Sequence, residues 1–208
     1  MLDATADLAL LHADDHLLVW SKPSGLHTVP AKPPGPQDCL LTRAAAAFPG
    51  ALLVHRLDRD TSGLVVMART RLAQRHLGWQ FERRQVAKTY IARVAGRVAE
   101  DEGRIDLALR CDWPNRPRQM VHADGKPSTT LWRVLAREPG ATRLELTPLT
   151  GRSHQLRVHC LALGHPILGD PLYGDPALAP RLQLHAARLG FRHPDGGARR
   201  AFAAPAPF

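Results

Sequence analysis

The stretch LLVHRLDRDTSGLVVMA at residues 52–68 is the most informative part of the chain for the fold. Two short apolar runs, 52–54 and 63–68, flank a dense polar turn, which predicts two strands joined by a loop. A loop between strands can present a carboxylate from a rigid scaffold. Asp, Thr and Ser also favour turns because they hydrogen-bond nearby backbone groups, so an ordinary turn explains the same pattern. Spacing alone does not decide whether Asp58 or Asp60 is a functional acid.

The segments on either side of this stretch predict many strands and few helices. Further strands are expected at or near residues 16–20, 87–95, 105–109, 129–136, 143–149 and 183–191. Helices are expected at 40–48 with Asp38 as the cap, at 72–81 with Thr70 as the cap, and at 153–163 before Gly164. Because strands and helices do not alternate regularly, this order predicts an α+β fold with a mostly antiparallel mixed sheet and flanking helices. No composition shift marks a linker, so we expect one domain over residues 1–208.

The charge balance points towards nucleic acid without deciding the partner. The 208 residues carry 28 basic and 19 acidic side chains, a net charge of +9, and 24 of the basic residues are arginine. A basic surplus is typical of proteins that bind nucleic acid. A GC-rich genome also favours arginine, so the charge alone leaves the partner open.

The composition argues against membrane, secreted and cysteine-based classes. No apolar run approaches the ~18 to 20 residues that span a bilayer. The N-terminus, MLDATADLALL, has acids where a signal peptide carries a basic region. We therefore expect a cytoplasmic protein with no membrane partner. Three cysteines without a C-x-x-C pair support neither a disulfide framework nor a cysteine zinc site.

Two further stretches combine charge with regular patterning. GRSHQLRVH at 151–159 places His154 and Arg157 near one face of a predicted helix, where arginine offers a two-pronged donor to an anion. An ordinary solvated face gives the same pattern. Tyr90 lies on the apolar face of the strand at 87–95, where a core tyrosine is the default interpretation.

Six stretches, taken in order, resemble the RluA family of pseudouridine synthases. They are KPSGL at 22–26, HRLDRDTSGL at 55–64, KTYIARVAG at 88–96, GRSHQLRVH at 151–159, GHPILGDPLYG at 164–174 and LHAARLGFRHP at 184–194. The resemblance covers essentially the whole chain. Larger family members carry an N-terminal S4-type RNA-binding domain, for which there is no room before Lys22, so we expect a catalytic domain without it.

The resemblance implies an RNA pseudouridine synthase, which isomerises uridine within structured RNA. It assigns Asp58 as the catalytic nucleophile and Arg157 as the ion-pair partner that keeps this carboxylate charged. The sequence does not decide whether Asp58 attacks C1′ or C6 or assists deprotonation at C2′. It assigns Tyr90 to base stacking and proton transfer, and Arg56 to base flipping, occupying the place of the flipped base. Because the product is an isomer, no cofactor and no metal are expected. The further residues expected to contact RNA are His55, Arg59, Thr61, Lys88, Arg116, Arg152, His154 and Leu156.

A finer resemblance concerns the substrate. CDWPNRP at 111–117, followed by GKP at 125–127, is similar to the short, dual-specificity member of the family. It implies a uridine in the tRNA anticodon loop (position 32) and a uridine in 23S rRNA (position 746) as targets. We expect RNA and not DNA as the partner, and a monomer.

Two other classes compete with this interpretation. One is a catalytically inactive RNA-binding relative of the same fold, against which the presence of Asp58, Tyr90 and Arg157 together argues. The other is a metal-dependent hydrolase. It is disfavoured because no H-E-x-x-H or H-x-H pair occurs, and because His154 and His159 are five residues apart.

Overall fold

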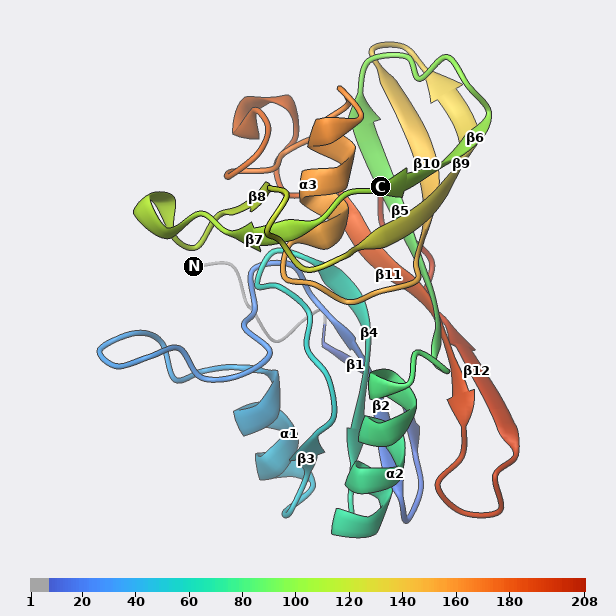
Figure 1. Cartoon of the computed structure of the whole chain (residues 1–208). Coiled ribbons are helices and arrows are strands. Elements are labelled where there is room, and N and C mark those ends of the chain that lie inside the picture. Colours follow the sequence, from blue (N-terminus) through green and yellow to red (C-terminus); the bar gives the residue numbers. More distant parts are fainter. Residues whose placement is uncertain (1–7) are drawn as a thin grey trace. The chain divides into compact units, whose positions relative to one another are not determined.

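The computed structural model describes residues 8–208, which form two compact units (Figure 1). The first unit contains residues 8–88 and 186–207, and the second contains Thr89–His185 and Phe208. The strands β5 (Ala87–Ala95) and β11 (Leu184–Arg192) each have residues in both units. Each unit combines antiparallel strands with helices, so the α+β prediction is confirmed.

The first unit is built around a strand that is buried at every position. This strand, β4 (Ser62–Ala68), pairs with β2 and with β3, and the strand order is β1-β2-β4-β11 with β12 added beside β11. A strand buried on both faces reads as a continuous apolar run, as GLVVMA does. The remaining elements of this unit are β1 (Ala9–Ala13), β2 (Leu17–Lys22), α1 (Leu40–Ala47), β3 (Leu52–Leu53), α2 (Arg71–Glu82) and β12 (Arg199–Ala203).

Of the two N-terminal caps predicted for the helices of this unit, one is confirmed and one is wrong. Thr70 caps α2 as predicted, because its hydroxyl accepts a hydrogen bond from the backbone N–H of Ala73. The prediction that Asp38 caps α1 is wrong. The cap is Cys39, whose Sγ accepts from the backbone of Thr42, while Asp38 forms a two-pronged ion pair with Arg43. Arg43 thus binds both carboxylate oxygens of Asp38, and the cap position falls to the next residue.

The second unit is an antiparallel sheet in the order β5-β10-β9-β6, with a separate two-stranded sheet of β7 and β8. Its core gathers Ala92 and Val94 of β5, and Tyr90 packs against the same cluster, as the alternation of that strand predicts. The remaining elements are β6 (Glu102–Asp106), β7 (Leu109–Cys111), β8 (Gln119–Val121), β9 (Thr129–Glu138), β10 (Ala141–Pro148), α3 (Gln155–Ala162) and the 3₁₀ turns Trp113–Asn115 and Pro176–Leu178.

Several elements differ from the sequence-based expectations. The strands β1, β8 and β12 are additional, and the strand expected near 105–109 divides into β6 and β7. The helix expected from 153 begins at Gln155, because His154 adopts a left-handed conformation with φ of 53°. In the described part of the chain, no helix is long and apolar enough to cross a membrane. Most of the acidic N-terminal stretch falls at residues 1–7, outside the described residues.

Candidate active site

The loop that carries Asp58 lies in the first unit and is held by the segment at 22–28. The Nζ of Lys22, which is 1% exposed, donates to the carbonyls of Pro23 (2.8 Å), Leu26 (2.7 Å) and Arg59 (2.9 Å). The three acceptors come from a turn and from the loop, so one buried ammonium group ties the two together. Sequence reasoning did not assign Lys22 to the site, although KPSGL was one of the motifs.

Two hydroxyl groups of the same segment complete this attachment. Ser24 Oγ donates to the carbonyl of Asp60 (2.7 Å). Thr28 Oγ1 donates to the carbonyl of Leu57 (2.8 Å) and accepts from its N–H (3.2 Å). The backbone is therefore fixed on both sides of Asp58, and the N–H of Thr61 donates to the Asp58 carbonyl to close the turn (3.2 Å).

The two acids of the loop have different surroundings. Arg59 binds both carboxylate oxygens of Asp60, at 2.8 Å and 3.1 Å, so an adjacent cation compensates the charge of Asp60. The sequence left the choice between Asp58 and Asp60 open. The Arg59–Asp60 pair gives Arg59, expected to contact RNA, a partner within the protein.

The charged group of Lys22 responds to its burial. Burial lowers the pKa of Lys22 to about 7, and the carboxylates of Asp60 and Asp58 act in the opposite direction. Two acids near a buried lysine thus retain part of its positive charge near neutral pH.

The remaining loop residues divide between internal and exposed positions. The ring of His55 stacks on Phe81 (4.4 Å between centroids), and its Nε2 accepts from the N–H of Val66 (3.1 Å). Burial, together with nearby Lys88, lowers the pKa of His55 to about 3, so the imidazole is neutral at physiological pH and brings no positive charge to RNA. Arg56 is exposed, and among residues 8–208 its side chain makes no hydrogen bond or ion pair.

Two other predicted RNA contacts belong to this unit. Thr61 is buried, with 3% of its surface exposed. Lys88 lies half-buried at the start of β5, and burial lowers its pKa, with Arg84 contributing in the same direction. Both side chains are therefore more enclosed than the sequence-based expectation of an RNA contact implies.

In the second unit, Arg157 projects from α3 into a buried ion pair with Asp170. Nε donates to Oδ2 (2.8 Å) and Nη2 to Oδ1 (2.6 Å), and the two side chains are 3% and 0% exposed. Asp170 also accepts from the backbone N–H groups of Leu172 (2.9 Å) and Tyr173 (3.1 Å). The carboxylate thus fixes both the guanidinium and its own loop.

Tyr173 packs beside this ion pair. The Cζ of Arg157 lies 5.1 Å from the centre of the Tyr173 ring. The Tyr173 hydroxyl accepts from the N–H of Gln119 (2.7 Å) and is hydrogen-bonded to Nδ1 of His154 (2.7 Å). Sequence reasoning missed Asp170 and Tyr173, although both lie in the motif GHPILGDPLYG. A fully buried acid is hard to predict from spacing because its partner is 13 residues away.

The start of α3 is fixed by the side chain of Gln155. Its Nε2 donates to the Thr129 carbonyl (3.0 Å) and to Thr130 Oγ1 (3.0 Å), while its Oε1 accepts from Thr150 Oγ1 (2.7 Å) and from the N–H of Arg152 (3.0 Å). Four hydrogen bonds on one amide set the direction of the helix, and so the position of Arg157.

The other predicted residues of the second unit differ in their surroundings: one is in the core, one is bonded to a backbone carbonyl and one is exposed. Leu156 is 7% exposed and belongs to the core cluster against which Tyr90 packs, so these two residues share one apolar group. Arg152 donates to the Pro127 carbonyl at 3.4 Å. Arg116 is exposed, with its Cζ 4.4 Å from the ring centre of Trp113, itself 66% exposed.

The predicted site residues thus fall into two groups. The first unit contains His55, Arg56, Asp58, Arg59, Thr61 and Lys88. The second unit contains Tyr90, Arg116, Arg152, His154, Leu156 and Arg157. Within residues 8–208, no group of three His, Cys, Asp or Glu side chains is arranged to hold a metal ion.

The sequence profile of the RNA pseudouridylate synthase family matches residues 16–162. Among solved structures, the human RNA pseudouridylate synthase domain containing 1 superposes with a TM-score of 0.83 at 30% identity, covering 97% of this chain and 84% of that one. The human RNA pseudouridylate synthase domain containing 4 superposes with a TM-score of 0.76 at 26% identity, covering 96% and 88%. The chain therefore belongs to the RNA pseudouridylate synthase family.

Within this family, the chain is similar to proteins of the RluA type. It is 52% identical to the dual-specificity RNA pseudouridine synthase RluA of Yersinia pestis, over 97% of this chain and 100% of that protein. It is 50% identical to the protein of that name from Escherichia coli (strain K12), over 97% and 94%. The resemblance inferred from the six motifs, and with it the enzyme class, are confirmed.

Proposed function

We propose that this enzyme converts uridine to pseudouridine in two structured RNAs, at position 32 of the tRNA anticodon loop and at position 746 of 23S rRNA. The observation that carries the proposal is the loop at 55–61, whose backbone is bonded to Lys22 and Thr28 on both sides of Asp58. The choice of RNAs draws support from the printed name of the relatives, dual-specificity RNA pseudouridine synthase, and from the CDWPNRP stretch.

The proposed chemistry breaks the N1–C1′ bond of the uridine, turns the base, and joins C5 to C1′. The C5 proton is released and N1 takes up a proton, so the product is an isomer of the substrate. Asp58 is the nucleophile, which requires its carboxylate to be ionised. Arg157 is proposed to form an ion pair with Asp58, in addition to the bonds that its Nε and Nη2 make to Asp170. Tyr90 is proposed to stack on the base and to take part in proton transfer.

The target base has to leave its stack before it can react, and unstacking costs a few kcal/mol. Arg56 is proposed to fill the vacated place, which its exposed side chain supports. Arg116 on its exposed Trp113 ring offers a stacking surface of the kind that binds unpaired bases. Seven further residues are proposed to contact the RNA or to fix the side chains that contact it. They are His55, Arg59, Thr61, Lys88, Arg152, His154 and Leu156.

We further propose that residues 8–208 act as one catalytic domain, as a monomer in the cytoplasm, where both RNAs are modified. No metal or cofactor is part of the proposed reaction, because the product is an isomer of the substrate.

The test is release of tritium from RNA containing 5-³H-uridine. We expect Asp58→Asn to abolish release while RNA affinity stays within about threefold of wild type, because the isostere keeps the shape of the side chain and loses its charge. Asp60→Asn, the matched control in the same loop, is expected to retain release. Full activity of Asp58→Asn contradicts the assigned nucleophile. Tight RNA binding by wild type without any tritium release supports the inactive RNA-binding alternative instead.

The choice of RNAs is tested separately by mapping pseudouridines in cells that lack the gene. Loss of pseudouridine at tRNA position 32 and at 23S rRNA position 746 is expected. Loss only at other positions contradicts the proposed targets and leaves the reaction itself intact.

A further inference from the structure

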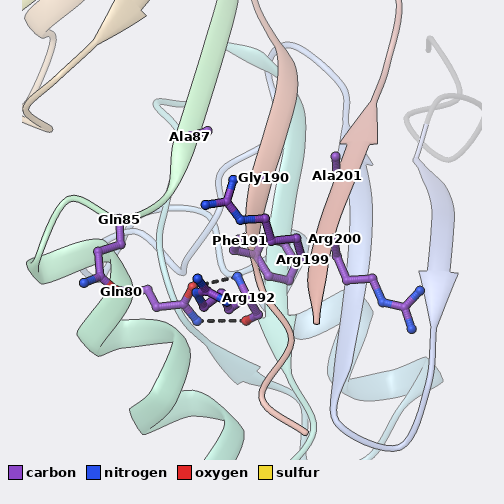
Figure 2. A pocket seen from close by; sticks show the side chains of 9 residues that line it. All are labelled: Gln80, Gln85, Ala87, Gly190, Phe191, Arg192, Arg199, Arg200 and Ala201. Carbon is purple, nitrogen blue, oxygen red and sulfur yellow. Dashed lines mark hydrogen bonds between the residues drawn. The ribbon is translucent and has the colours of Figure 1, made fainter. Parts of the chain in front are cut away.

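A cavity of about 550 Å³ lies in the first unit, and Figure 2 shows the side chains that line it. It is enclosed by the end of α2, the start of β5, and the paired strands β11 and β12. The residues that line it are Gln80, Gln85, Ala87, Gly190, Phe191, Arg192, Arg199, Arg200 and Ala201. None of the residues assigned to the reaction is among them.

The floor of this cavity is made by small residues. Gly190 and Ala201 are directly opposite each other in the pairing of β11 with β12, and Ala87 lies beside them. A Cβ placed on Gly190 would lie 3.5 Å from the Cβ of Ala87 and 3.7 Å from the carbonyl oxygen of Arg200, which is ordinary contact. The backbone therefore accepts a side chain at 190, and the hollow exists because the sequence places none there.

Positive charge is concentrated at the rim. Arg192 and Arg199 are directly opposite each other on the paired strands, an arrangement in which like charges repel. Within the described residues neither arginine forms an ion pair, and no acid lines the cavity. The side-chain hydrogen bond of Arg192 goes to the Gly197 carbonyl at 3.4 Å. An anion between the two guanidinium groups would relieve the repulsion.

The backbone at this rim is held rigidly. The side chain of Gln80, which is 1% exposed, donates to the carbonyl of Arg192 (2.8 Å) and accepts from its N–H (2.8 Å), as the dashed lines in Figure 2 show. A buried amide that satisfies both backbone groups of one residue fixes where its side chain starts. The arginine is thereby positioned in advance of any ligand.

We propose that this cavity binds a backbone phosphate of the substrate RNA, at a second contact distinct from the residues that act on the uridine. Arginine binds phosphate through two parallel hydrogen bonds, and such contacts add affinity without reading sequence. The identity of the ligand as RNA rests on the proposed function, and free phosphate or a mononucleotide shares the same chemistry. The proposal gives two of the arginines in the basic surplus, Arg192 and Arg199, a role in phosphate binding.

The neighbouring arginines of β12 provide a matched pair of variants. Figure 2 shows the side chain of Arg200 directed away from that of Arg199, as alternation along a strand requires. Arg200 therefore borders the cavity through its backbone. Arg199→Gln and Arg200→Gln remove the same charge from adjacent positions of one strand, and only the first removes a guanidinium group from the cavity.

The experiment measures the affinity of the full chain for a tRNA transcript by fluorescence anisotropy at several salt concentrations. Loss of one phosphate contact is expected to weaken the binding of Arg199→Gln about five- to tenfold near 0.1 M salt, and to reduce the slope of log K against log salt by about one. Arg200→Gln is expected to change affinity less than twofold. Equal affinities and slopes for the two variants overturn the proposal.

A second variant tests the cavity without changing charge. Gly190→Leu fills the floor and is expected to weaken RNA binding at least threefold while thermal unfolding stays close to that of wild type. Wild-type affinity in a folded Gly190→Leu protein overturns the proposal.

Two further measurements are needed. Phosphate binding distinguishes free phosphate from RNA as the ligand, and tritium release distinguishes a failure of this proposal from a failure of the proposed function. If Arg199→Gln loses binding of inorganic phosphate, yet matches Arg200→Gln in RNA affinity, the cavity binds free phosphate and the RNA assignment is overturned. Tritium release at saturating RNA is expected to be unchanged in Arg199→Gln, with the effect confined to KM. Absence of release from wild type would contradict the proposed function, whereas the affinity comparison would still test the cavity.

Discussion

The loop that carries Asp58 and the helix that carries Arg157 are held in place by different means. In the first unit, Lys22 and Thr28 bind backbone groups of residues 57–59, and neither contact uses the side chain that is assigned to the reaction. In the second unit, the guanidinium of Arg157 is itself held by Asp170. The contacts of Lys22 and Thr28 therefore do not depend on the side chain at 58, whereas at 157 the proposed function and the attachment depend on the same group.

This difference also concerns charge. Arginine keeps its proton under all ordinary conditions, while a buried lysine can lose its proton. The cation of the Arg157–Asp170 pair is thus fixed, and the attachment made by Lys22 depends on pH.

Asp170→Ala is expected to destabilise the protein most. The substitution leaves the buried Arg157 guanidinium without its carboxylate and removes the acceptor for two backbone N–H groups. Breaking a buried ion pair in this way costs about 3 to 5 kcal/mol in the free energy of unfolding. Urea unfolding followed by circular dichroism measures the loss.

The matched control is Asp175→Ala, which removes an exposed carboxylate that accepts from the N–H of Ala177 (2.8 Å) in a nearby turn. Its expected cost is about 1 kcal/mol. A cost for Asp170→Ala no greater than that of the control would contradict the structural importance of the pair. If Asp170→Ala does not fold, Asp170→Asn, which keeps an acceptor for the loop, permits the same comparison.

Lys22→Met is expected to cost about 2 to 3 kcal/mol, somewhat less than Asp170→Ala. Three carbonyl groups lose their donor, while removal of a buried charge offsets part of the loss. Because the Arg59 carbonyl is among them, tritium release is expected to fall more than RNA affinity. Lys32→Met, at an exposed position, is the control and is expected to leave both unchanged. An equal fall in release and affinity would count against positioning of the Asp58 loop by Lys22.

The same contrast explains how far the sequence predicts the site. Pattern and turn chemistry are local, so the strand at 87–95, the Thr70 cap and the loop at 55–61 were predicted close to where they occur. The acids and bases that fix the functional residues are not local. Lys22 binds a carbonyl 37 residues away, and Arg157 an acid 13 residues away. Neither partner can be read from the spacing of charges.

Short strands at the edge of the sheet were also not predicted from the sequence. The strand β12 has the sequence RRAFA, in which Phe202 is the one large apolar residue, so no run of alternating apolar residues marks it. The strand β12 forms because residues Arg188–Arg192 of β11 pair with it along the whole length of β12. Pairing of this kind depends on the fold and not on a local pattern. The cavity beside β12 therefore could not be predicted from the sequence either.

The smallest expected effect is the pH dependence of the Lys22 attachment. Burial lowers the pKa of Lys22 to about 7 in the folded state, whereas the unfolded chain keeps the ordinary value of 10.5. The cost of burying the charged form is present in full below about pH 7 and is relieved as the pH rises towards 10.5, since the unfolded state then binds more protons than the folded state. Wild type should therefore gain about 1 kcal/mol relative to Lys22→Met between pH 7 and pH 8. Urea unfolding of both proteins across this range measures the difference. The corresponding difference between wild type and Asp170→Ala should stay flat, because arginine does not titrate there. A flat profile for Lys22→Met as well would mean that the ammonium group keeps its proton, and that the two attachments differ in geometry alone.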